Sequence, residues 1–366
     1  MSIRHLELAD FRIFHSAHIE PEPEGTTVIT GPNGTGKTSV LEALAYLGTR
    51  RSFRGVPPEA MVRTEATSAI VRVEIEGADS PTLVEAEILP AGRGRTRVNR
   101  KSVTGRKELA AAAPCTIFSP EDLAIISGGP KGRRDLLDDA LALLDPEGAR
   151  AADETDRVLR QRAALLRQSG GRATGDVAAT LDVWDQRLAD AGKVLVAARE
   201  RLVSDLEHLV GEAYSRLAGA GDQVLMQQSY ERSWDGDLLD ALVTSRADDL
   251  RRGVNTVGPH RDDLFLAVEG REARTHASQG EQRCLALALR LGVHTLIRTR
   301  TPLVPTLLLD DVFSELDPRR SRALLAGLPP GQAMLTTAQP APPEVEAAKV
   351  YAMDAGGHVA VSRDRS

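Results

Sequence analysis

Hydrophobic positions near the start of the chain change from a period of two to the period of a helix. Weak alternation over residues 3–14 predicts a first strand, and the apolar run at 27–30 predicts a short buried strand. A Gly-rich turn follows, and the pattern over residues 38–47 predicts a helix whose C-cap is Gly48. This order of strand, Gly-rich turn and helix frames the first candidate site.

The middle of the chain changes from strand-like to helical patterning near Pro146. Residues 70–76 and 82–89 alternate as two paired antiparallel strands would. From 147 to about 217 the sequence is rich in Ala, Leu and Arg, and Ser-Gly-Gly at 169–171 interrupts its helical pattern once. We therefore expect two antiparallel helices, or groups of helices, that form a hairpin-like arm inserted into the first domain.

The last third of the chain returns to mixed patterning. It contains a short helical stretch at 233–252, a strand-like segment at 263–268 and a long helical pattern over 280–298. A fully apolar strand is predicted at 305–309. Strands at both ends of the chain, with helices between them, are typical of an α/β fold that carries an insertion.

Composition excludes several classes of protein. Hydrophobic residues make up 42% and charged residues 27%, which is typical of a globular chain. The net charge of −6 means that any contact with DNA must come from a local patch or from a surface that two subunits form. Cys115 and Cys284 stand far apart, so neither a zinc site nor a disulfide framework is indicated. Charges interrupt the N-terminus and the longest apolar segments, so we expect a cytoplasmic protein without a membrane span.

A phosphate-binding loop is predicted where the second strand meets the first helix. Its sequence matches G-x-x-x-x-G-K-[ST], a pattern whose backbone N–H groups surround a β-phosphate. Lys37 is expected to bridge the β- and γ-phosphates, and the Thr38 hydroxyl to bind Mg²⁺. A chance Gly-rich turn is the alternative, and the flanking strand and helix count against it. The candidate residues are Gly31, Pro32, Asn33, Gly34, Thr35, Gly36, Lys37 and Thr38.

Two acids follow the apolar strand near residue 309. Asp310 is predicted to hold Mg²⁺, and Asp311 to polarise the attacking water as a general base. By itself the pattern is weak, because acids often begin a turn after a strand. Together with a phosphate-binding loop it indicates the second half of a nucleotide site.

A third candidate segment precedes the long helix. Ser278 and Glu281 have the spacing of a capping box, so a plain helix start is one interpretation. The alternative is an anion site at the helix N-terminus, made by Ser278, Gln279, Gly280 and Glu281, for the γ-phosphate bound by a second copy of the chain. Residues 314–317, Ser-Glu-Leu-Asp, would line the same boundary or simply cap the next helix.

Basic residues are concentrated in two places. Each cluster is either a solvated face or a contact for DNA phosphates. The denser cluster comprises Arg93, Arg95, Arg97, Arg100, Lys101, Arg106 and Lys107, and the second comprises Arg50, Arg51 and Arg54. A third group, Lys131, Arg133 and Arg134, is interpreted as bracing the lobe, and Arg12 is open to either a ligand contact or a salt bridge.

Histidines offer little evidence for a metal site. His260 stands near Asp262 and Asp263, but Gly258 and Pro259 predict a turn there and no further ligand is visible. The remaining N-terminal histidines are interpreted as structural; they are His5, His15 and His18.

The order of the motifs resembles that of ABC-type ATPase heads: phosphate loop (31–38), signature (278–282), Walker B (307–311) and D-loop (314–317). Further stretches are similar to the bacterial RecF family. They are LADFR at 8–12, LEA at 41–43, FSPEDL at 118–123, GGP at 128–130 followed by two arginines, VGPHRDDL at 257–264 and LDDVFSELD at 309–317. The resemblance extends from about residue 3 to about residue 340.

This resemblance implies a fold and a function. It implies an α/β ATPase head with mixed sheets, made of residues 1–145 and 255–366, and a helical second lobe at 146–254. It also implies a weak Mg²⁺-dependent ATPase. This ATPase would dimerise with ATP on duplex DNA near single-strand gaps, and ATP hydrolysis would release it from the DNA. RecO, RecR and RecA are the implied partners, in gap repair, replication restart and the SOS response.

Two differences from transporter ATPases and three alternative classes of protein bear on this resemblance. Transporter ATPases have a Gln where this chain has Ser119-Pro120-Glu121, and a switch His where it has Thr336-Thr337-Ala338. Fewer sensors of the γ-phosphate favour slow turnover and count against a transporter subunit. An SMC-type ATPase would need a far longer coiled coil between Lys37 and Ser278. A scaffold that binds ATP without hydrolysing it is disfavoured by Asp311.

Overall fold

The chain forms two compact units in the computed structural model. The structure describes residues 2–77, 80–92, 94–172, 174–219, 225–339, 344–354 and 356–364. The first unit comprises Met1–Leu123, Leu209–Val224 and Gln279–Ser366, and the second comprises Ala124–His208 and Leu225–Ser278. The assignment of residues 146–254 to a separate helical lobe stays a prediction.

One sheet of the first unit is antiparallel, with the order β2-β1-β4-β5-β6-β7. Its strands are β1 (Ser2–Phe11), β2 (Phe14–Ile19), β4 (Ala69–Glu76), β5 (Thr82–Ile88), β6 (Arg95–Val98) and β7 (Lys101–Ser102). The predicted pairing of 70–76 with 82–89 is confirmed. The prediction of one strand over 3–14 is wrong, because the chain turns back near Arg12, where the backbone takes a positive φ of 56°.

The other sheet of the first unit is mixed, with the order β15-β14-β3-β13-β12-β8. Its strands are β3 (Gly25–Thr30), β8 (Cys115–Phe118), β12 (Thr306–Asp310), β13 (Gln332–Thr337), β14 (Ala347–Met353) and β15 (Val359–Asp364). All neighbours except β14 and β15 pair in parallel. The carboxyl ends of β3, β8, β12 and β13 therefore meet at one edge, where open α/β sheets bind ligands.

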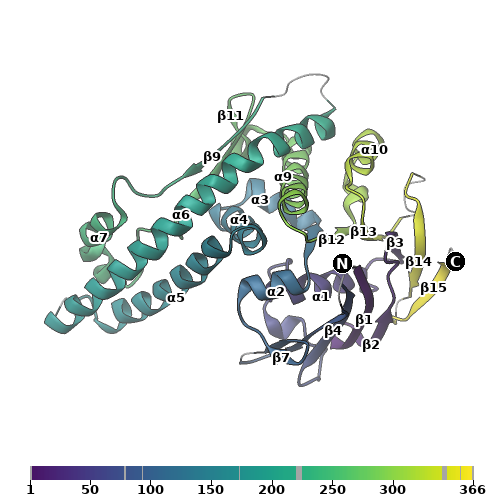
Figure 1. The fold of residues 1–366 in the computed structure, drawn as a ribbon, viewed down its shortest axis with the longest axis horizontal. Coiled ribbons are helices and arrows are strands. Elements are labelled where there is room, and N and C mark those ends of the chain that lie inside the picture. The colour runs from purple at the N-terminus through teal and green to yellow at the C-terminus, as the bar shows by residue number, and fades with distance from the viewer. Residues whose placement is uncertain are drawn as a thin grey trace. The chain divides into compact units, whose positions relative to one another are not determined.

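Helix α1 (Lys37–Thr49) contacts strands of both sheets of the first unit (Figure 1). Burial on every side explains why its sequence is apolar almost throughout. The prediction of Gly48 as the C-cap is wrong. A Cβ on Gly48 would lie 2.8 Å from the Ala113 carbonyl oxygen, so this glycine allows close packing within the helix. The left-handed cap is Arg50, with φ 54°.

The first unit contains further helices. They are α2 (Arg106–Ala112), α9 (Gln279–Arg300), α10 (Pro318–Gly327) and the short 3-10 turns η1 (Pro58–Ala60), η2 (Pro120–Asp122) and η3 (Val312–Glu315). The long helix predicted at 280–298 is confirmed as α9. Among the described residues, no helix is both long and apolar enough to cross a membrane.

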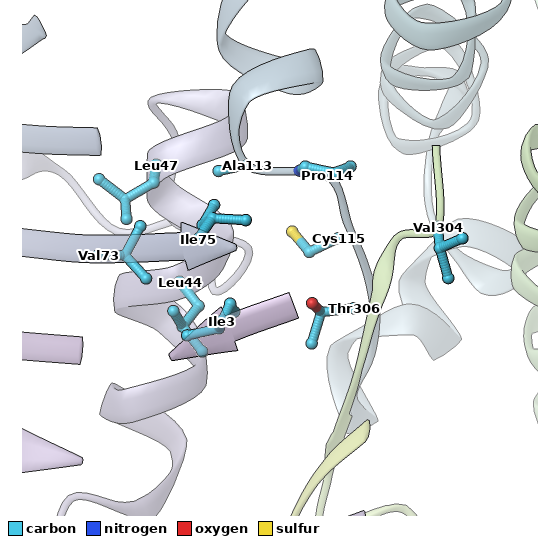
Figure 2. Close-up of a pocket in the computed structure, with 10 residues that line it drawn as sticks. All are labelled: Ile3, Leu44, Leu47, Val73, Ile75, Ala113, Pro114, Cys115, Val304 and Thr306. Carbon is cyan, nitrogen blue, oxygen red and sulfur yellow. The ribbon is translucent and has the colours of Figure 1, made fainter. Parts of the chain in front are cut away.

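An apolar cavity lies inside the first unit, between α1 and the two sheets (Figure 2). Ile3, Leu44, Val73 and Cys115 are among the residues that line it. No charged side chain takes part in the lining. A nucleotide carries several negative charges, so this cavity does not match one.

The second unit is mainly helical. It contains α3 (Leu123–Ser127), α4 (Pro130–Leu144), α5 (Pro146–Gln168), most of α6 (Gly175–Ala218), α7 (Leu238–Arg252) and α8 (Ala273–His276). Its small sheet has the order β11-β10-β9, from β9 (Met226–Glu231), β10 (Asp263–Val268) and β11 (Arg271–Glu272). The predicted helical pair, broken at 169–171, is confirmed as α5 and α6, which lie side by side (Figure 1). The sequence analysis missed α4.

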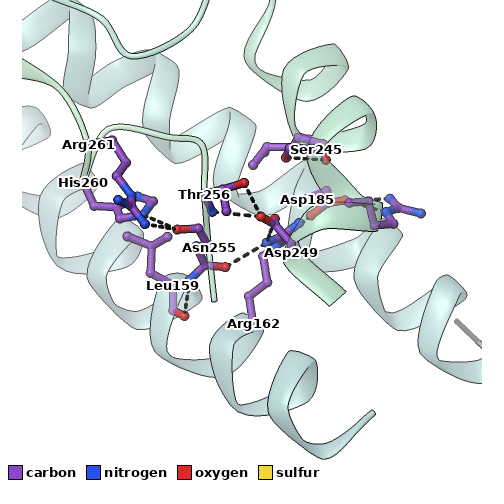
Figure 3. Close-up of polar contacts among 11 residues, drawn as sticks. Leu159, Arg162, Asp185, Ser245, Asp249, Asn255, Thr256, His260 and Arg261 are labelled. Atoms are coloured by element: carbon purple, nitrogen blue, oxygen red, sulfur yellow. Dashed lines mark hydrogen bonds and ion pairs between the residues drawn. The ribbon is translucent and has the colours of Figure 1, made fainter. Parts of the chain in front are cut away.

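A buried charge network joins α5, α6 and α7 in the second unit (Figure 3). Arg162 is fully buried and donates to Asp185 at 2.6 Å, to Asp249 at 2.5 Å and to Asn255 at 2.8 Å. Both carboxylates are fully buried as well. Burying charges is costly unless they are paired and hydrogen-bonded, so these residues hold one another in place.

Candidate nucleotide site

The predicted phosphate loop connects β3 to α1, at the edge where the parallel strands end. Gly31 and Gly36 both have positive φ, and neither has room for a side chain. A Cβ on Gly31 would lie 2.5 Å from the Met353 carbonyl oxygen, and a Cβ on Gly36 would lie 2.6 Å from the Phe14 ring. The tips of β14 and β2 thus fix the shape of the loop at two points.

Lys37 and Thr38 begin α1 and point along the loop. The Lys37 ammonium donates to the carbonyl oxygens of Gly31 and Pro32, at 2.8 Å each. Burial lowers the pKa of Lys37, and the attraction of Asp311 and Asp310 only partly offsets that effect. The loop thus holds a partly desolvated cation among backbone groups.

Asp310 ends β12 beside the phosphate loop, and its side chain is buried. One carboxylate oxygen accepts hydrogen bonds from the Thr38 hydroxyl at 2.9 Å and from the Thr336 hydroxyl at 2.6 Å. Burial raises the pKa of Asp310, and the nearby Glu121 and Asp311 carboxylates add to the increase, whereas the two hydroxyl hydrogen bonds oppose it. Two predicted metal ligands from distant parts of the chain, Thr38 and Asp310, therefore touch.

Asp311 follows in a left-handed conformation, with φ 46°. Its backbone N–H donates to the Thr336 hydroxyl at 3.1 Å. The carboxylate oxygen Oδ1 is buried and has no hydrogen-bond partner among the residues that the structure describes. A strained backbone with an unsatisfied carboxylate oxygen is typical of a functional position.

The oxygen atoms gathered here fit Mg²⁺. The hydroxyl of Thr38 and the carboxylate of Asp310 are hard ligands of the kind that this ion prefers. Asp311, whose oxygen Oδ1 has no partner among the described residues, directly follows Asp310 in the chain. Mg²⁺ takes few protein ligands and completes its shell with water and phosphate oxygens. The donor set is therefore sufficient without further side chains.

Sequence reasoning missed two neighbours of these acids. Thr336 was noted only as the position where a transporter has a His, yet it bonds to both Asp310 and Asp311. Glu121 lies just beyond the end of β8, the strand that pairs with β12. Its negative charge raises the pKa of Asp310 in addition to the larger effect of burial. The parallel order of β8, β12 and β13 would have identified both, but the sequence does not give that order.

The predicted signature residues lie at the start of α9. Ser278 belongs to the second unit, whereas Gln279, Gly280 and Glu281 belong to the first. Ser278 and Gln279 are exposed. A Cβ on Gly280 would meet the Arg320 guanidinium at 2.7 Å, so the first turn of α9 faces α10.

The predicted D-loop makes ordinary local contacts. Asp317 caps α10 by accepting hydrogen bonds from the backbone N–H groups of Arg319 and Arg320, at 2.9 and 3.0 Å. The Ser314 hydroxyl donates to the Asp311 carbonyl oxygen at 2.8 Å. This segment therefore directly supports the residue proposed as general base.

In the denser basic cluster, acids on the neighbouring strand neutralise part of the charge. On the antiparallel sheet, Arg95 lies opposite Glu87 and Arg97 lies opposite Glu85, so acids accompany both arginines. Arg100 and Lys101 are exposed at the turn between β6 and β7, and Arg93 lies outside the described residues. A DNA contact in this cluster would depend mainly on the turn.

Other predicted positions have structural partners. Arg12 forms a bidentate pair with the fully buried Glu42, at 2.6 and 2.7 Å. Arg133 pairs with Asp263 at 2.6 Å and so braces the second unit as expected. The His260 Nε2 atom lies 3.1 Å from the Asn255 carbonyl oxygen, and burial lowers the pKa of His260 to about 4.

Comparisons with known proteins identify relatives of this chain. Residues 2–333 match the RecF/RecN/SMC N terminal domain family. A relative from Beutenbergia cavernae, named DNA replication and repair protein RecF, is 41% identical over 98% of this chain and 99% of its own. A solved structure of the recombination mediator protein RecF-ATP in the RecFOR pathway has a TM-score of 0.88 at 26% identity, over 99% and 98% of the two chains. An SmcHead bound to the C-winged helix domain of ScpA shares the fold, with a TM-score of 0.56 at 16% identity over 99% and 97%.

Proposed function

The chain belongs to the RecF family, and we propose that it is an ATP-dependent clamp on DNA that acts in recombinational gap repair and replication restart. The observation that carries the proposal is the contact of the Thr38 hydroxyl with Asp310, which joins the phosphate loop to the Walker B acid. Relatives named RecF over nearly the whole chain support the assignment to DNA repair.

In this proposal the phosphate loop binds the β- and γ-phosphates of ATP. Backbone N–H groups of the loop surround the β-phosphate, and the Lys37 ammonium bridges the β- and γ-phosphates. An incoming phosphate oxygen replaces a loop carbonyl as the partner of the Lys37 ammonium. The loop residues proposed to contact the phosphates are Gly31, Pro32, Asn33, Gly34, Thr35, Gly36, Lys37 and Thr38.

Hydrolysis rests on the two acids and their supports. Bound Mg²⁺ would neutralise the charge that develops on the phosphate oxygens. Thr38 and Asp310 would hold the ion, with Asp310 oriented by Thr336. Asp311 would accept a proton from the attacking water through its unpartnered oxygen.

A second copy would complete the site. The segment Ser278 to Glu281, of which Ser278 and Gln279 are exposed, begins a long helix, and helix N-termini favour anions. In a dimer this segment would cap the γ-phosphate of the partner copy. ATP binding therefore favours the dimer, and loss of the γ-phosphate on hydrolysis releases it.

The wider role follows from the family. We propose that the dimer binds duplex DNA beside a single-strand gap and works with RecO and RecR to load RecA, which also connects it to the SOS response. The RecFOR pathway named for the similar solved structure supports RecO and RecR as partners. Such a protein works in the cytoplasm, where the bacterial chromosome lies.

Steady-state ATP hydrolysis with and without gapped duplex DNA, at low and moderate salt, tests this function. We expect DNA to stimulate hydrolysis and the stimulation to weaken as salt rises, because phosphate contacts release counterions. A rate of ATP hydrolysis that does not change with DNA would contradict the proposed DNA clamp. It would favour a switch that a protein partner triggers. Removing Mg²⁺ with EDTA should abolish turnover.

The dimer has its own test. Ser278→Arg should leave ATP binding to the monomer intact but prevent dimerisation and hydrolysis, measured by light scattering and nucleotide titration. The matched control is Ser169→Arg, at the break between α5 and α6. Normal dimerisation of the Ser278 variant would contradict the role of the signature.

A further inference from the structure

The outer face of the first two strands carries a group of side chains that the nucleotide site does not use. His5 on β1, His18 on β2 and Glu20 just after β2 lie together on the solvent side of the antiparallel sheet. Their side chains are about half exposed, at 45%, 52% and 50%. The sequence analysis treated both histidines as structural.

The three side chains converge on one point. The Nε2 atom of His18 lies 3.1 Å from Oε1 of Glu20, and the Nδ1 atom of His5 lies 3.5 Å from the same oxygen. One ligand atom from each residue lies within 4.8 Å of the others. The two imidazole rings are stacked, with centroids 5.7 Å apart. A single ion with bonds of about 2.0–2.2 Å could join all three after small side-chain rotations.

The backbone beneath these side chains is fixed. Leu6 pairs with Ile19 in the β1–β2 ladder, and both are fully buried, so the register cannot slip without exposing the core. The Tyr351 hydroxyl of β14 accepts a hydrogen bond from the Glu20 N–H and donates one to the Glu20 carbonyl oxygen, each at 3.0 Å. Only the side chains need to move when a ligand binds.

The charges around the group favour a cation. The Glu20 carboxylate supplies an anionic ligand atom between the two imidazoles. Glu7, which lies opposite His18 in the ladder, is already paired with Arg72 at 2.8 Å. The ammonium of Lys349 lies over the Tyr351 ring, 5.6 Å from its centroid. Its positive charge would repel an incoming metal ion.

We propose that His5, His18 and Glu20 form a surface site for one divalent transition-metal ion, with Zn²⁺ as the representative ligand. Two imidazoles and one carboxylate are a donor set for Zn²⁺ and its neighbours in the transition series, and not for Mg²⁺. Water completes the coordination sphere on the exposed side. The ion ties β1 to β2, the strands whose connecting turn packs on Gly36 of the phosphate loop.

Zn²⁺ titration of the metal-free full-length protein by calorimetry tests this site. We expect one site of micromolar affinity in the wild type and a loss of at least about tenfold in His18→Ala and in Glu20→Gln. The matched controls are His15→Ala and His358→Ala. Each removes an exposed histidine that lies near a single aspartate, Asp10 or Asp354, without a third ligand. Equal affinity in His18→Ala, or an equal loss in the controls, would overturn the proposal.

A spectroscopic measurement makes the test independent of stability. Co²⁺ added to the wild type should give visible d–d absorption with nitrogen ligation, and the double variant His5→Ala/His18→Ala should give the spectrum of aqueous Co²⁺. Circular dichroism confirms that the double variant is folded. An unchanged Co²⁺ spectrum in that variant would also overturn the site.

Discussion

Each unit of this protein buries aspartates, and Asp310 of the first unit is held in the opposite way to Asp185 and Asp249 of the second. In the second unit, Asp185 and Asp249 both pair with the fully buried Arg162. In the first unit, Asp310 is held by the hydroxyls of Thr38 and Thr336, and burial raises its pKa. A buried carboxylate that has an arginine is structural. One that has only hydroxyl partners beside a phosphate loop is suited to receive a cation.

The two sites also differ in how fully their buried charges are hydrogen-bonded. Arg162 satisfies several acceptors at once and orders three helices, so its cost of burial is offset within the unit. The Asp311 oxygen Oδ1 has no hydrogen-bond partner among the described residues, and Asp311 also has a left-handed backbone. Functional sites often retain such unfavourable features because a ligand relieves them.

The largest expected effect is on catalysis. Asp311→Asn should lower kcat for ATP hydrolysis by about 10²–10⁴, because a general base is lost while the phosphate loop is untouched. ATP affinity should stay near that of the wild type, and the ATP-bound dimer should accumulate in light scattering. Asp237→Asn, which changes the acid that caps α7 in the second unit, is the control. Full activity of the Asp311 variant would contradict its proposed role.

The next effect is on the stability of the second unit. Arg162→Met should lower its free energy of unfolding by about 3–5 kcal/mol, because two buried carboxylates lose their partner. The two tryptophans, Trp184 and Trp234, both belong to this unit, so their fluorescence in urea reports on it alone. Arg157→Met removes a half-exposed partner of Glu154 and should cost less than about 1 kcal/mol. Similar costs for both variants would contradict the comparison.

The third effect depends on pH. Burial lowers the pKa of His294 in the first unit to about 4, so folding favours the neutral imidazole. The stability that this provides is complete above pH 6.5 and is lost as the pH falls toward 4, by up to about 3 kcal/mol. His294→Gln keeps a hydrogen-bonding side chain for Thr116 and should unfold with a shallower dependence on pH in calorimetry. Identical pH profiles for variant and wild type would contradict the assignment.

The smallest effect has opposite signs in the two units. Without Mg²⁺, Asp310→Asn should raise the thermal stability of the first unit by on the order of 1 kcal/mol, since an amide avoids the cost of a buried charge. The raised pKa of Asp310 means that this gain should shrink as the pH falls. Asp249→Asn should instead destabilise the second unit. Calorimetry and tryptophan fluorescence separate the two transitions, and equal signs would break the comparison.

Local sequence was sufficient for much of the fold. The strand, Gly-rich turn and helix at the phosphate loop, the helical pair α5 and α6, and the strand β10 were all predicted from consecutive residues. The failures lie where packing replaces local preference. Gly48 continues α1 because the chain at Ala113 approaches it closely, and Arg50 takes the left-handed cap instead.

The sequence by itself determined the candidate chemistry: a loop shaped for phosphate, an apolar strand that ends in two acids, and a polar helix start. Only the tertiary structure decided which groups meet. The order of the parallel strands brings Thr336 and Glu121 beside Asp310, and the β1–β2 ladder brings His5, His18 and Glu20 together. A motif depends on consecutive backbone geometry, whereas a site depends on strand order and register, which long-range burial selects.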